Sequence, residues 1–275
     1  MRLPSYFLRK IRLAFILGST TLTFFSCIPE KKPATEAFTF NNMEWNDSVK
    51  TDLSKAYCHI KIDYPATGHP ELLRNIREWL SDQLGGTLCE KEIGQEDFIP
   101  QYGKMLLDSA QSDFRSLAES KLGTNYEWNI TVKLADETDR YLTYIAEIYT
   151  YSGGAHGSYI QQGATFRKND GRKFGWDMFK NAARTELPSL LKDAIHNQYF
   201  EPGTDKEFYG QLLDVDTASY RFPLPQTEPY IAQDGVHFIY QEYEIAAYAA
   251  GSPSCVLPFG QVKELLTHSA CELIE

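Results

Sequence analysis

The sequence predicts an α+β fold with a mainly antiparallel sheet, helices packed on it and two intimately associated halves. Two observations carry this prediction. Apolar and polar residues alternate in segments that follow one another through short polar turns, as in Glu127–Leu134 and Tyr141–Tyr151, and such neighbours usually form antiparallel hairpins. Segments with helical spacing of apolar residues lie between these groups of strands. This order of elements is typical of α+β proteins.

The first half opens with a strand over Tyr57–Tyr64, where alternate apolar residues share one face. The spacing of leucine, isoleucine and tryptophan then predicts a helix over Pro70–Gln83, which ends before Gly85 and Gly86. A longer helix is expected between Asp97 and Leu122. The hairpin described above follows it.

A glycine-rich corner, Ser152–Gly157, joins the second strand of that hairpin to a further strand over Ser158–Arg167. Its three glycines permit positive φ angles and a close approach of the backbone, so a tight corner is expected. Asn169-Asp170-Gly171 then predicts another turn.

The second half mixes short strands and helices around an extended, proline-containing linker. Because Pro188 lacks a backbone N–H, we expect it in the first turn of its helix. The predicted elements are a strand over Arg172–Gly175, helices over Trp176–Phe179, Leu187–Phe200 and Asp205–Leu213, the linker Phe222–Pro229, a turn at Asp234-Gly235 with a following strand, a strand over Cys255–Leu257 and a helix over Gly260–Thr267.

Two blocks of the sequence resemble the RsiV-like extracellular domain. This domain of unknown function is shared by RsiV-type anti-sigma factors and the non-catalytic region of PdaC-type peptidoglycan deacetylases. The first block comprises Tyr151–His156, Tyr159–Phe166, Asp170-Gly171 and Trp176–Phe179, and the second comprises Tyr240–Gly251 with Val256–Phe259. The resemblance covers roughly Tyr57 to Leu266. It implies an α+β fold and a binding role outside the cytoplasm.

The N-terminus predicts an exported lipoprotein. Residues 1–26 have four basic residues and a short apolar run, Leu13–Phe25, as in a signal peptide. Ser26-Cys27 resembles a lipoprotein cleavage site, although Phe24 and Phe25 make the motif loose; an ordinary secretory peptide is the alternative. We expect Cys27 to be lipidated and to anchor the protein in the cell envelope, in the outer membrane rather than the plasma membrane.

The expected organisation after the signal peptide is a flexible tether over residues 27–46, an N-terminal half over 47–151 and a C-terminal half over 152–275. Removing residues 1–26 leaves 23 basic and 37 acidic residues, a formal charge of −14. Such an acidic exported domain disfavours nucleic acid and favours cationic partners, although simple solubility also explains the charge.

Four further cysteines, Cys58, Cys89, Cys255 and Cys271, are disulfide candidates in an exported protein. They allow three pairings. The preferred one joins Cys58 to Cys89 and Cys255 to Cys271, because each loop then stays within one half of the chain.

The sequence contains no nucleophile elbow, phosphate loop, dinucleotide fingerprint or metalloprotease helix, and we expect no cofactor and no metal. The residues most open to a ligand-binding role are Tyr149, Tyr151, His156, Tyr243, Glu244 and Tyr248. For His156 and Glu244 the competing interpretation is a structural role in the fold.

The preferred function is therefore a non-catalytic, lipid-anchored envelope protein that binds an extracytoplasmic ligand. The ligand is either a cationic protein such as a lysozyme or a cell-wall glycan such as peptidoglycan. RsiV-type ectodomains act as lysozyme receptors, so the resemblance implies the former. No stretch after Cys27 is long and apolar enough to cross a membrane, which sets the chain apart from an RsiV-type signalling protein. The alternative is an envelope glycan-modifying enzyme that uses Glu244 or His156.

Overall fold

A computed structural model describes residues 37–86, 93–94, 97–213 and 222–275 of the chain. The predicted signal peptide, Cys27 and Cys89 lie outside the described residues. Thr35–Glu275 forms one compact unit. Among the described residues, no helix is long and apolar enough to cross a membrane.

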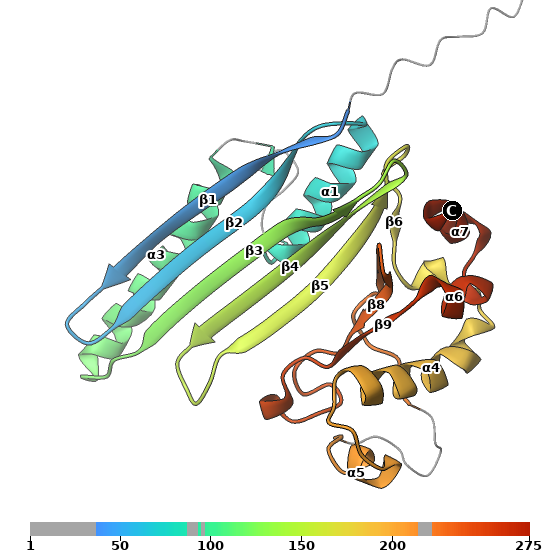
Figure 1. Cartoon of the computed structure of the whole chain (residues 1–275). Coiled ribbons are helices and arrows are strands. Elements are labelled where there is room, and N and C mark those ends of the chain that lie inside the picture. Colours follow the sequence, from blue (N-terminus) through green and yellow to red (C-terminus); the bar gives the residue numbers. More distant parts are fainter. Residues whose placement is uncertain (1–36, 87–92, 95–96, 214–221) are drawn as a thin grey trace, which may run out of the picture. The chain divides into compact units, whose positions relative to one another are not determined.

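A six-stranded sheet forms the larger part of this unit, and its strands lie in the order of the chain, β1-β2-β3-β4-β5-β6 (Figure 1). Only β2 and β3 pair in parallel; the other neighbours are antiparallel. The strands are β1 (Thr39–Lys50), β2 (Lys55–Thr67), β3 (Asn125–Glu137), β4 (Tyr141–Ser152), β5 (Ser158–Arg167) and β6 (Lys173–Phe174). The predicted hairpins of β3, β4 and β5 are confirmed.

Two helices cover one face of this sheet. The helix α1 spans Pro70–Gln83, as the sequence predicts, and α3 spans Phe98–Glu119. Both fall in the connection between β2 and β3, and this long connection allows those two strands to run parallel. Buried residues of both helices form one core with inward-facing side chains of the sheet. The opposite face, which we call the open face, carries neither helix.

The expected tether is partly wrong. Residues 39–46, assigned to it from their lack of periodicity, belong to β1, which pairs with β2 over the whole of its length. Residues 39–46 form a strand because of a tertiary contact. Trp45 packs on α3 at Gly103, where a Cβ atom would lie 1.9 Å from its ring. This packing places β1 at the edge of the sheet although its own sequence alternates only weakly.

A second, three-stranded antiparallel sheet contains β7 (Tyr230–Ala232), β8 (Gly235–Ile239) and β9 (Ser254–Leu257). Its core includes residues of α4 (Ala183–Gln198), α5 (Asp205–Tyr209) and the C-terminal helices. The remaining elements are short: the 3₁₀ helices η1 (Trp176–Met178), η2 (Tyr248–Ala250) and η3 (Lys263–Leu265), and the helices α6 (Phe259–Val262) and α7 (His268–Ile274). The α+β class and the mainly antiparallel sheet are confirmed.

The helix α4 begins earlier than predicted. It starts at Ala183, so Pro188 lies in its second turn and not in its first. The N–H groups of Ala183, Arg184 and Thr185 each bond to the carbonyl three residues before. This tighter winding adds residues to the start of the helix ahead of the proline.

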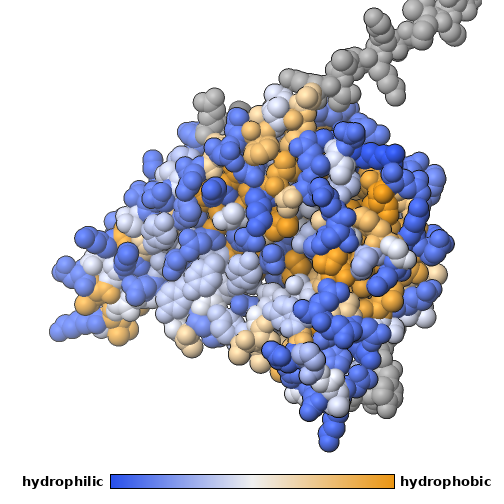
Figure 2. Space-filling view, in the orientation of Figure 1, coloured by the Kyte–Doolittle hydropathy of each residue, from blue (hydrophilic) through white to orange (hydrophobic). Residues whose placement is uncertain are grey.

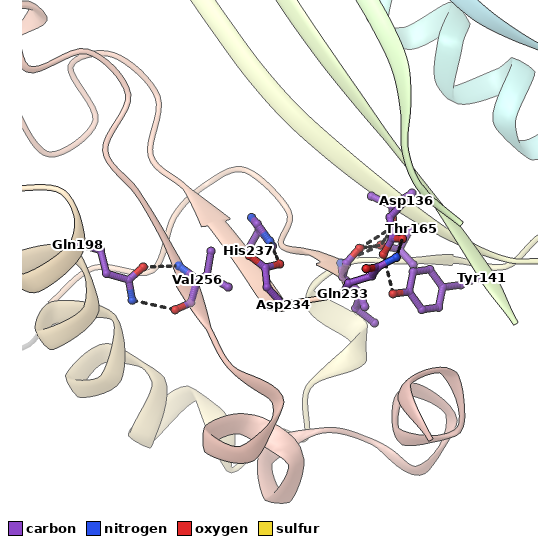
Figure 3. Close-up of polar contacts among 10 residues, drawn as sticks. Asp136, Tyr141, Thr165, Gln198, Gln233, Asp234, His237 and Val256 are labelled. Atoms are coloured by element: carbon purple, nitrogen blue, oxygen red, sulfur yellow. Dashed lines mark hydrogen bonds and ion pairs between the residues drawn. The ribbon is translucent and has the colours of Figure 1, made fainter. Parts of the chain in front are cut away.

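Buried polar groups join the two sheets (Figure 3). The N–H of Ile231 on β7 donates to Thr165 Oγ1 on β5 at 2.8 Å, and Thr143 Oγ1 on β4 donates to the Ile231 carbonyl at 2.6 Å. The two threonine hydroxyls are 2.8 Å apart. Asp136 accepts hydrogen bonds from Tyr141 and from Gln233 beside β7.

The large sheet continues past residue 151 as β5 and β6. The predicted division of the chain into two halves at that residue stays a prediction.

The described cysteines form no disulfide, so the preferred pairing is wrong: Cys58, Cys255 and Cys271 are free thiols. Cys58 is buried in the core between the large sheet and its helices, whereas Cys255 is buried in the core of the second sheet. Burial raises the pKa of both thiols to about 12. Cys271 lies on α7, and its Sγ contacts the Lys263 carbonyl at 3.7 Å. Proximity along the chain therefore did not predict the state of the described thiols.

Candidate functional site

The glycine corner between β4 and β5 adopts the backbone that its sequence predicts. Gly153 and Gly154 have φ angles of +85° and +95°, in the region that favours glycine. The ring of Tyr149 lies directly against Gly157, where an added Cβ would be 2.5 Å from it. Tyr151 Oη donates to the Gly154 carbonyl at 3.0 Å. These contacts fix the corner and expose His156 at its tip.

His156 meets two tyrosines, Tyr243 and Tyr248, that lie about ninety positions later in the chain. Its ring stacks on Tyr248 with centroids 3.8 Å apart, and its Nε2 lies 3.1 Å from Tyr243 Oη. Its Nδ1 lies 2.8 Å from the Gly157 carbonyl. Because a carbonyl only accepts, Nδ1 carries the proton, and in the neutral imidazole Nε2 accepts from the Tyr243 hydroxyl.

Tyr243 has an unusual backbone. Its φ angle is +65°, a region that is rare for a bulky residue, and its side chain is nevertheless 53% exposed. Glu244 holds this turn in place: its carboxylate accepts the N–H of Gln241 at 2.8 Å and that of Gln226 at 2.7 Å. A strained, exposed aromatic residue that the surrounding structure fixes so firmly is a feature of functional sites.

Side chains of the same turn bind backbone groups at the edge of β5, where a neighbouring strand would otherwise pair. Glu242 accepts the N–H of Tyr159 at 3.1 Å. The Gln241 amide accepts the N–H of Gln161 at 3.2 Å and donates to the carbonyl of the same residue at 2.8 Å. The turn therefore cannot move independently of the large sheet.

We call Tyr149, Tyr151, His156, Tyr243 and Tyr248 the aromatic corner. The structure brings these five predicted residues together, whereas it gives the sixth, Glu244, the structural role just described. The sequence did not single out two further tyrosines. Tyr159 lies opposite Tyr149 in the register of β4 and β5, and Tyr57 lies on the same face of the sheet, on β2. Counting residue pairs outward from the glycine corner would have placed Tyr159 beside Tyr149.

The aromatic corner continues onto the open face of the large sheet, where half-buried tyrosines alternate with polar residues. Across the strands, Tyr149 is flanked by Tyr159 on β5 and by Asn129 and His59 beyond β4. Figure 2 shows pale residues of intermediate hydropathy gathered below the centre of the molecule, beside strongly hydrophilic ones. Rigid aromatic rings set among polar groups form a surface suited to binding.

Acidic groups lie beside these rings. Desolvation, followed by the charge of Glu242, raises the pKa of the Tyr248 hydroxyl. Desolvation and the charge of Glu147 likewise raise the pKa of Tyr159. Glu147 is paired with Lys133 at 3.2 Å. The tyrosines therefore stay neutral hydroxyl groups next to negative charge.

The described part of the chain contains no group of three or more His, Cys, Asp or Glu residues that could hold a metal ion. Both ring nitrogens of His156 and both carboxylate oxygens of Glu244 already have protein partners.

Two family models match the chain. Residues 51–159 match the model described as deacetylase PdaC, and residues 176–260 match a model described as a protein of unknown function, DUF3298. No curated protein matches the chain significantly. The aromatic corner takes residues from both matched regions: three lie near the end of the first region and two lie in the second.

Solved structures of DUF3298 proteins share the fold. One from Bacteroides fragilis has a TM-score of 0.73 at 18% identity and covers 87% of this chain and 98% of its own. Another, from Pseudomonas aeruginosa, has a TM-score of 0.58 at 12% identity and covers 86% of this chain and 97% of its own. Together with the family models, these structures confirm the resemblance to an RsiV-like, PdaC-type domain of unknown function. The two structures show the fold alone, and the family models suggest an extracellular, non-catalytic domain.

Proposed function

We propose that this chain, which joins a PdaC-type region to a DUF3298 region, is a lipid-anchored, non-catalytic binding protein of the cell envelope. The aromatic corner is the contact site for an extracytoplasmic ligand. The observation that carries this proposal is Tyr243, which is held at a positive φ angle and yet exposes half of its side chain. The fold tolerates strain there to present an aromatic side chain to solvent.

The ligand that fits best is a cationic protein of the lysozyme type. The chain from Cys27 onward has a formal charge of −14, from 23 basic and 37 acidic residues, and this charge would steer a basic partner toward it. Glu242 and Glu147 bring part of that negative charge to the rings of the site. Exposed tyrosines can supply the buried contacts that determine affinity once the partner has arrived.

The enzymatic alternative receives less support from the same geometry. A general acid or base needs a free carboxylate or imidazole within reach of a substrate. Glu244 instead binds two backbone N–H groups, and His156 is engaged at both nitrogens. We therefore propose no reaction.

Substitution of Tyr243 by glycine tests the site. Glycine removes the aromatic contact and also relieves the strain of the positive φ angle, so we expect weaker binding without loss of stability. Calorimetry of the unlipidated mature protein with a basic lysozyme should give a saturable isotherm in moderate salt, and the variant should bind about tenfold more weakly, a loss of ~1.4 kcal/mol. Thermal unfolding should show an unchanged or higher Tm.

Met105→Ala is the matched control, because Met105 is exposed on α3, on the other side of the sheet. It should leave binding unchanged. A glycine variant that binds normally but unfolds at a lower temperature would assign Tyr243 a structural role and remove the proposed site. Retention on purified peptidoglycan without lysozyme binding would replace the cationic protein by a cell-wall glycan.

Anchoring is tested separately at Cys27. The Cys27→Ser protein should carry no lipid and should appear in the soluble fraction, because the thioether-linked acyl chains supply the membrane affinity. Metabolic labelling with a fatty acid and fractionation of the outer membrane measure both properties. Labelled, membrane-bound Cys27→Ser protein would exclude this anchor.

A further inference from the structure

A polar pocket of about 290 Å³ lies on the other side of β5 from the aromatic corner. Neighbouring residues of a strand point to opposite faces. Gln161 thus faces the open face, while Gln162 lines the pocket. The other walls are the C-terminal end of α1, Lys173 of β6 and residues 226–228 of the linker. None of the residues proposed above for ligand binding lines this pocket.

The linker wall of the pocket is fixed by contacts on three sides. The N–H of Gln226 donates to Glu244 at 2.7 Å, Thr227 Oγ1 accepts from the Gln241 amide at 2.7 Å, and Glu228 is paired with Lys173 at 2.8 Å. Prolines at 223, 225 and 229 restrict the same segment. The pocket therefore has its shape before any ligand enters, which lowers the entropic cost of binding.

Glycines on β5 and after β6 let the start of β7 and the linker before it approach this closely. A Cβ at Gly163 would lie 2.3 Å from the ring of Tyr230, and one at Gly175 would lie 2.6 Å from the Glu228 carboxyl carbon. These close approaches place the linker beside the sheet. The pocket forms between them, and the ends of polar side chains line it.

The polar groups that line the pocket are mostly neutral. Three carboxamides, Gln83, Gln162 and Gln226, and the hydroxyl of Thr227 offer both donors and acceptors. Gln83 is 8% exposed, and it donates to the Trp79 carbonyl and accepts from the Gln162 amide nitrogen. Those bonds orient both amides, and no hydrogen bond from the described residues reaches the Gln162 oxygen, which can accept from a ligand.

The charged groups of the pocket disfavour anions. Lys173 is paired with Glu228, and Asp82 adds a further negative charge at the end of α1. A carboxylate or phosphate would meet these charges without a free cation among the described residues of the lining. Hydroxyl groups, in contrast, can donate to the carboxylates and exchange hydrogen bonds with the carboxamides. The buried indole of Trp79 supplies an apolar wall.

We propose that this pocket binds a neutral, hydroxyl-rich small molecule of monosaccharide size. Its volume is near the lower end of the range for small-molecule sites. The proposal stands apart from the proposed function, since no residue of the aromatic corner lines the pocket.

Glucose and N-acetylglucosamine are suitable probes, and calorimetry with the unlipidated mature protein is the measurement. At least one of the two sugars should bind saturably with a Kd on the order of 1 mM. Gln162→Leu removes the oriented amide at similar size, and it should weaken binding at least tenfold. Gln161→Leu, one residue away on the opposite face, is the matched control and should bind normally.

Gln226→Leu provides a second test if Gln162→Leu fails to fold, because Gln226 is exposed and its backbone makes the structural contact. It too should weaken sugar binding. Tyr243→Gly should leave sugar binding intact, so failure at the aromatic corner and failure at the pocket remain distinguishable. Absence of saturable binding of both sugars, or equal binding by wild type and the folded pocket variants, would overturn the proposal.

Discussion

Gly171→Ala is expected to destabilise the protein by about 3 kcal/mol. Gly171 has a φ angle of +71°, and an added Cβ would lie 2.6 Å from the Glu71 carbonyl oxygen and from the Leu72 nitrogen. These are backbone atoms of α1, so they cannot move aside as the end of a side chain would. The backbone conformation costs roughly 1–2 kcal/mol and the clash roughly 1–3 kcal/mol. Urea unfolding measures the loss.

Gly154→Ala is the matched control for Gly171→Ala. Its φ angle is also positive, +95°, but no atom lies within 4 Å of an added Cβ. The alanine there should cost only the backbone strain, about 1 kcal/mol. Equal losses for the two variants would show that α1 moves aside for the added methyl group at no cost, so the close approach does not require glycine at position 171.

Thr165→Val is expected to cost about 2 kcal/mol by breaking the contact between the two sheets. The Thr165 hydroxyl is buried and accepts the N–H of Ile231, while the two threonine hydroxyls bridge to the carbonyl of the same residue (Figure 3). Valine has nearly the same shape but no acceptor. It leaves a buried N–H without its partner, a loss of ~1–3 kcal/mol.

Thr131→Val serves as the control for this variant, because Thr131 is half-buried on the open face of β3. Valine suits a strand, so stability there should change by less than about 0.5 kcal/mol. Unfolding of both variants by urea gives the comparison. If Thr165→Val is as stable as wild type, the hydroxyl network does not hold the two sheets together.

Local regularities of the sequence determined most of the secondary structure. The spacing of apolar residues and the two glycines after it delimit the helix Pro70–Gln83. Alternation and short polar turns likewise predict the consecutive strands β3, β4 and β5. Such elements follow from the backbone preferences of residues that lie within a few positions of one another in the sequence.

The glycine corner was predictable for the same reason, and its residues were assigned to the site before the fold was known. What the sequence did not show is that His156 stacks on Tyr248 and meets Tyr243. That meeting depends on the second sheet docking against β4 and β5 through Ile231. No spacing within the chain encodes such a contact.

Three further features depend on tertiary structure alone. They are the formation of the edge strand β1, the parallel pairing of β2 with β3 and the free-thiol state of the described cysteines. β1 alternates weakly and becomes a strand because Trp45 fits over Gly103 of α3. The preferred pairing assigned Cys58 and Cys255 each to a cysteine of its own half of the chain, yet each is a free thiol enclosed in a different core. The sequence by itself thus determined the short-range elements and the corner residues. The long-range choices came from which apolar surfaces bury one another, and packing between distant segments sets that outcome.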